Sequence, residues 1–213
     1  MWTDLIQAIG ASKDALAAIF AAVAIIVSIL GLRAWRKQIT GKTEYEVARR
    51  LLLTVLKARD AVSALRAPFI SGDEMAEAAK GKYEITGDDD EEKPDSEKLT
   101  ELAYGRRWER VRESLSALAV EQLEAQVLLK RGVEERLQAF QDCILELHAA
   151  LEQYLEMRRG EYTPPQEDEE RIKRVVLRNW GAAKSLRKDV FGERFEATIR
   201  DLEGVLKPFL DLR

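Results

Sequence analysis

The chain has few of the residues that catalytic and metal chemistry needs. Its 213 residues include one cysteine and one histidine. The single Cys143 excludes an intramolecular disulfide and a multi-cysteine zinc site, and a lone cysteine is typical of the reducing cytoplasm. A carboxylate-bridged metal pair needs a Glu-x-x-His motif on each of two helices. The residue three positions before His148 is Leu145, so neither half of such a site is present. We therefore expect no metal and no cofactor.

Other motifs of catalytic or binding chemistry also fail. Gly41-Lys42-Thr43 resembles the end of a phosphate-binding loop, but Arg36 replaces the glycine that this loop requires five positions earlier. Cys143 has no well-aligned basic partner to make it a nucleophile, so we interpret it as a packing residue and place His148 at the rim of the core. The acidic run 88–90 lacks the register of a calcium loop. The sequence predicts no catalytic residue and no enzyme.

The most distinctive segment present is a run without charge. The eighteen residues from Ala15 to Leu32 contain no charged side chain, and Ser28 is their one polar side chain. As a helix the run is roughly 27 Å long, close to the thickness of a bilayer's hydrocarbon core. A buried core helix normally has a polar stripe, and a cleaved signal peptide needs a basic start. The run therefore predicts a retained transmembrane helix over residues 15–35.

Positive charge predicts how this helix is oriented. Arg33, Arg36, Lys37 and Lys42 follow the run, whereas only Lys13 lies just before it. The positive-inside rule then places the C-terminal side in the cytoplasm and residues 1–14 outside, as a short extracytoplasmic or interfacial segment. We expect a membrane protein with a single span and its N-terminus outside.

Small residues repeat along the predicted span at intervals of four and three. Close approach of small residues is what lets helices associate within lipid, so this stripe predicts self-association or docking on a partner's span. The abundance of alanine in such spans is the alternative explanation. The stripe consists of Ala17, Ala21, Ala24, Ser28 and Gly31.

Charge is unevenly distributed beyond the span. From Arg33 to Arg66 there are nine basic and three acidic residues, a net charge of +6, and from Asp73 to Glu101 twelve acidic and four basic, a net charge of −8. A basic stretch beside a cytoplasmic membrane face predicts contact with anionic lipid headgroups. No nucleic-acid-binding motif accompanies it. The residues expected to contact lipid are Arg33, Arg36, Lys37, Lys42, Arg49 and Arg50.

The remainder of the chain reads as helices without a strand pattern. Thr43 and Glu46 form a capping box that predicts a helix start, with Gly41 as a joint. Further helices are predicted over 73–80, from 95 or 96 to about 130, after an interruption at Gly132, from 167 to 188, and from 191 onward. An acidic loop over 86–94 is expected to be mobile. Along 133–154 seven apolar residues repeat at heptad spacing, which predicts a helix seated in a bundle core. They are Val133, Leu137, Phe140, Ile144, Leu147, Leu151 and Tyr154.

A further similarity lies in residues 35–38, the GKTEY junction and its continuation through residues 41–52, residues 57–60 and 67–70, and the end from Phe191 to Leu210. These stretches resemble a family of uncharacterised bacterial proteins with an N-terminal membrane helix and a helical cytoplasmic region. The similarity covers about a third of the chain. The resemblance implies a location in the bacterial inner membrane and no particular activity.

Together these features predict an all-α protein with one N-terminal transmembrane helix, followed over 41–213 by a cytoplasmic bundle of four or five helices. The first functional hypothesis is a non-enzymatic, membrane-anchored module that binds a protein partner or a second copy of itself. The alternative is an oligomeric membrane pore or membrane-perturbing effector, for example in bacterial defence, assembled through the span.

Overall fold

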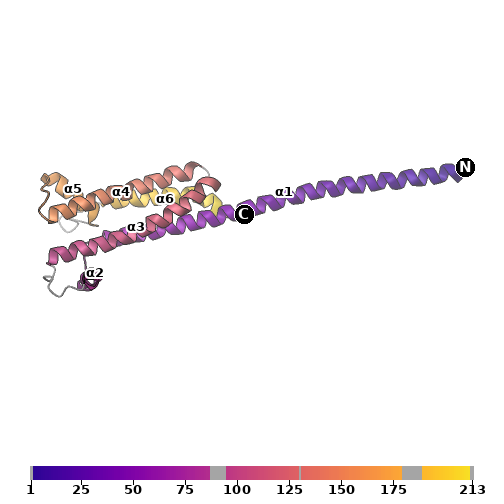
Figure 1. The fold of residues 1–213 in the computed structure, drawn as a ribbon. Helices are drawn as coiled ribbons and strands as arrows, with labels where there is room; N and C mark the ends of the chain where they lie inside the picture. Colours follow the sequence, from indigo (N-terminus) through magenta and orange to yellow (C-terminus); the bar gives the residue numbers. More distant parts are fainter. Residues whose placement is uncertain (1, 87–94, 130, 179–188, 212–213) are drawn as a thin grey trace. The chain divides into compact units, whose positions relative to one another are not determined.

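A computed structural model describes residues 2–86, 95–129, 131–178 and 189–211 (Figure 1). Within the helices, the side chains at 2–19, 21, 22, 34, 37, 81–86 and 131 are not described. The described ranges contain helices and short connections and no strand, which confirms the predicted all-α class. The predicted loop segment 87–94 and the predicted helical residues Trp180, Ala183 and Leu186 lie outside the described residues.

These ranges contain six helices, and the predicted span and four- or five-helix bundle together give five or six. The long helix α1 comes first, and α3 and α4 are the longest of the others. Their bounds are α1 Trp2–Leu65, α2 Gly72–Thr86, α3 Ser96–Leu128, α4 Arg131–Arg158, α5 Gln166–Val176 and α6 Val190–Leu210.

Helix α1 is continuous, so the predicted helix start at Thr43 and joint at Gly41 are wrong. Thr43 does not cap a helix, because its Oγ1 donates to the carbonyl of Ile39 at 3.1 Å, one turn earlier in the same helix. Inside a helix, a threonine hydroxyl can donate its hydrogen bond to the carbonyl of the residue four positions earlier. Gly41 costs a helix only about 1 kcal/mol relative to alanine, too little to end it without a cap.

The chain divides into two compact units, Met1–Glu46 and Val47–Asp211. The predicted boundary at residue 41 lies slightly before this division. In the first unit every described side chain from Val23 to Leu32 is exposed. Within the part of the chain whose side chains are described, no helix combines the length and apolarity that a membrane crossing needs. The predicted span lies partly outside that part, at residues 15–19, 21, 22 and 34.

The second unit is a helical bundle with one apolar core. Helix α4 packs against both α5 and α6, and α3 packs against α4 (Figure 1). All seven predicted heptad residues of α4 are at most 8% exposed, so that prediction is confirmed. The end of α1 enters the same core with Val47, Ala48, Leu51, Val55, Ala58, Val62 and Leu65.

Two predicted helix limits are wrong. The helix expected to reach residue 188 ends at Val176, because Leu177 is extended, with φ −106° and ψ 119°. Beyond it, the N–H of Arg178 donates to the carbonyl of Arg66 at 2.7 Å. Gly132 does not interrupt the chain's helices, since α4 begins one residue before it.

The heptad helix offers a direct test of this core. Leu147 is fully buried and Leu145 is 63% exposed on the same helix. We expect Leu147→Ala to lower the free energy of unfolding by about 2–5 kcal/mol, because it removes buried methyl groups and leaves a cavity. Leu145→Ala should change it by less than about 0.5 kcal/mol. Urea denaturation of both variants measures the difference, and equal losses would contradict the assigned helix face.

Candidate functional site

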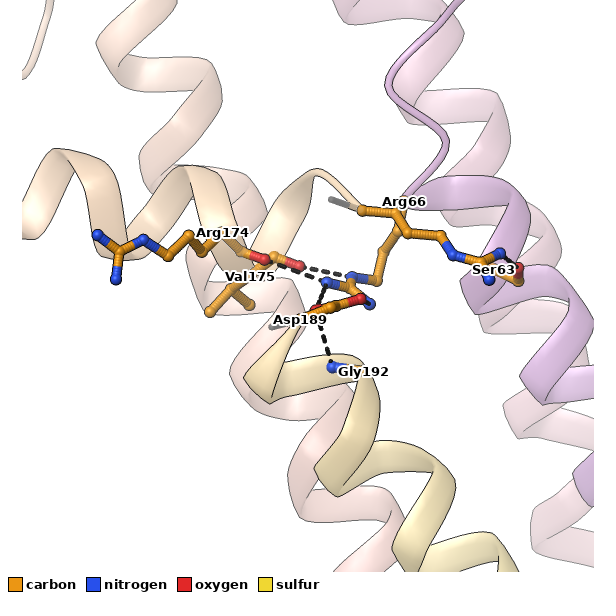
Figure 2. A network of polar contacts seen from close by, with 7 residues as sticks. Ser63, Arg66, Arg174, Val175, Asp189 and Gly192 are labelled. Atoms are coloured by element: carbon orange, nitrogen blue, oxygen red, sulfur yellow. Dashed lines mark hydrogen bonds and ion pairs between the residues drawn. The ribbon is translucent and has the colours of Figure 1, made fainter. Parts of the chain in front are cut away.

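The most complete polar site surrounds Arg66, the first residue after α1. Its side chain is 5% exposed, and its Nε donates to the carbonyl of Val175 at 2.7 Å. Its Nη2 donates to the carbonyl of Arg174 at 3.1 Å. The two terminal nitrogens, Nη2 and Nη1, donate to the carboxylate oxygens of Asp189 at 2.7 and 3.0 Å. The guanidinium also lies 4.6 Å from the centre of the Phe191 ring. Figure 2 shows Arg66, Asp189 and the carbonyls of Arg174 and Val175 converging from the ends of α1 and α5 and the start of α6.

Asp189 serves the start of α6 as well as Arg66. Its Oδ1 accepts a hydrogen bond from the N–H of Gly192 at 3.0 Å, which caps the helix (Figure 2). A Cβ at Gly192 would collide with the Asp189 carboxylate, so this position requires glycine. Burial alone raises the pKa of Asp189, but the hydrogen bonds from Arg66 and Gly192 outweigh burial and hold that pKa below its ordinary value.

A cleft of about 430 Å³ lies beside this cluster. Its walls carry both signs of charge, with Arg59, Arg178 and Arg200 opposed by Glu193 and Glu196. Arg178 also donates to the Ser63 hydroxyl at 3.4 Å. Because cations and carboxylates both line the same space, the cleft does not present the single sign of charge that selects an anion or a cation.

A second buried arginine, Arg107 of α3, holds the connection between α1 and α2. Its side chain is 5% exposed, and it donates to both carboxylate oxygens of Glu74 at 2.6 and 2.8 Å. It also donates to the carbonyls of Ala67 and Phe69 at 2.7 and 2.8 Å. Hydrogen bonds from Arg107 lower the pKa of Glu74. The arginine therefore ties the connection between α1 and α2 to α3.

Neither arginine cluster is built for catalysis. Each guanidinium is occupied by a carboxylate and by backbone carbonyls, which leaves it bound to the protein rather than turned toward a ligand. Cys143 lies elsewhere in the core, and burial raises the pKa of its thiol, which opposes formation of a nucleophilic thiolate. His148 stacks on Trp108 with ring centres 4.2 Å apart. Its half-exposed place at the edge of the core agrees with the predicted one.

The structure places the predicted self-association stripe on α1 but describes only part of it. The side chains of Ala17 and Ala21 lie outside the described residues. Ala24, Ser28 and Gly31 are exposed, and the Ser28 hydroxyl donates to the carbonyl of Ala24 at 2.7 Å. Added atoms at Gly31 would meet nothing within 4 Å. Nothing in the described part of α1 packs on these three residues, and their self-association stays a prediction.

The six predicted lipid-contact residues all lie on α1. Arg33, Arg36, Lys42 and Arg49 are exposed, and the Lys37 side chain lies outside the described residues. Arg50 differs from the others. It pairs with Glu121 at 3.2 Å and also with Glu124, both on α3, so its charge is balanced within the bundle.

Sequence reasoning missed both buried arginines. Arg107 had one available signal, because it falls at helical spacing among the core residues Tyr104, Val111 and Leu118 of α3. A charged residue on an apolar stripe is either paired or costly. Arg66 had no such signal, since its partners lie more than a hundred residues away in the chain.

No protein-family model, curated protein or solved structure matches this chain. The resemblance to a bacterial membrane-protein family therefore stays a prediction, and function has to be argued from the residues.

Arg106 and Arg107 make a matched pair for testing the α1–α2 connection. Arg106 is 46% exposed and 3.6 Å from Glu77, whereas Arg107 is buried. We expect Arg107→Gln to lower the free energy of unfolding by about 3–5 kcal/mol, because Glu74 and two carbonyls lose their partner. Arg106→Gln should cost at most about 1 kcal/mol. Chemical denaturation checks this, and a small effect of Arg107→Gln would refute the structural role.

The lowered pKa of Asp189 predicts how its contribution depends on pH. Its stabilisation is complete above its unfolded value of 3.8 and is lost as the pH falls through the lower native pKa. At pH 7 we expect Asp189→Asn to cost about 3 kcal/mol, because Arg66 loses a charged partner. This gap between variant and wild type should narrow below pH 3.8.

Urea denaturation midpoints of the wild type and of Asp189→Asn, at neutral and at acid pH, measure this difference in stability. Glu74 titrates in both proteins, so its effect cancels in the comparison. Asp60→Asn, at a carboxylate whose side chain is 70% exposed, is the control and should show no comparable loss. A gap that stays constant with pH would contradict the assigned ion pair.

Proposed function

We propose that the protein is a non-enzymatic, single-pass membrane protein whose bundle acts as an interaction and assembly module at the cytoplasmic face. The observation that carries this proposal is the uncovered apolar surface of α1. Between Phe20 and Trp35, nine large apolar side chains are described, and each is 48–71% exposed. They are Phe20, Val23, Ile25, Ile26, Val27, Ile29, Leu30, Leu32 and Trp35.

Such a surface is costly in water. Soluble monomers rarely expose a contiguous apolar patch of more than a few hundred Å², and here the apolar residues occur on all sides of a helix. A helix that is apolar all round belongs in a protein core or in lipid. Ser28, the run's polar side chain, donates its hydroxyl to the carbonyl of Ala24, so it can enter lipid without an unsatisfied donor. A bilayer is therefore the environment that fits residues 15–35.

The exposed cations after the run support the proposed orientation. Arg33, Arg36 and Lys42 are exposed, and Trp35 is 59% exposed beside them. Basic residues collect on the cytoplasmic side of a span, and tryptophan collects at the interface. We propose Arg33, Arg36, Lys37, Lys42 and Arg49 as the headgroup contacts. Arg50 contributes least, because Glu121 and Glu124 already balance it.

The bundle fits a binding role better than a catalytic one. Its two buried arginines, Arg66 and Arg107, donate their hydrogen bonds to carboxylates and backbone carbonyls of the protein itself. The Cys143 thiol has a raised pKa, and the cleft beside Arg66 has walls of mixed charge. What these features provide is a stable surface at a membrane rather than a reacting group.

The experiment is flotation of the full-length protein with vesicles that contain anionic lipid. We expect the wild type to float and to resist extraction at alkaline pH. Lysine at the centre of a span costs about 2.5–3.5 kcal/mol, so Ile25→Lys with Ile29→Lys should release the protein into the soluble fraction. Leu53→Lys introduces the same charge at a 45% exposed leucine in the bundle part of α1, and this control should still float.

Recovery of the wild type in the soluble fraction would overturn the proposal. The alternative of a pore rests on the small-residue stripe, of which Ala24, Ser28 and Gly31 are exposed. Leakage of a dye from the same vesicles, abolished by Ala24→Leu, would replace the anchor by the pore. Flotation without leakage keeps the interaction module.

A further inference from the structure

We draw no further inference here: the strongest candidate, the cleft of about 430 Å³ beside Arg66 and Asp189, belongs to the polar site already described, and the mixed charge of its walls selects no class of ligand.

Discussion

The bundle depends on one buried charge, the guanidinium of Arg66. A charge removed from water is tolerated only when it is paired and hydrogen-bonded. Arg66 meets that requirement only where the end of α5, the cap of α6 and the end of α1 come together. Arg107 imposes the same condition on Glu74 and on the carbonyls just after Arg66. The two arginines thereby fix the backbone where α1 ends.

The two units of the chain differ in how far the apolar side chains of α1 are exposed. In Val47–Asp211 the buried apolar side chains of α1 belong to the core, and Leu53 is an exposed exception. In Met1–Glu46 the large apolar side chains described from Phe20 to Trp35 are all exposed. The same backbone geometry continues through both, because α1 has no break from Trp2 to Leu65. The two parts of α1 therefore differ in the environment that their apolar side chains require, which is lipid for one and a protein core for the other. This difference is the basis of the membrane-bound module that we propose.

Predictions from periodicity succeeded where burial follows directly from spacing. The seven heptad residues of α4 repeat the helical period without exception, and all of them are buried. Predictions of helix ends failed where a local signal competed with the rest of the helix. Thr43 has the form of a cap, but its hydroxyl bonds to Ile39 within α1. At the end of α5, the Arg66 side chain donates to the carbonyl of Val175, and the Arg66 carbonyl accepts from the N–H of Arg178.

The sequence by itself determined the all-helical class, the core side of the helices from Val47 onward and the charge-free run, because these depend on residue type and spacing along a helix. It also showed that the residues for common metal sites are missing. Only the tertiary structure decided that Arg66 and Arg107 are buried and that Arg50 is balanced by α3. These properties depend on which distant residues come into contact, and no local pattern records such contacts.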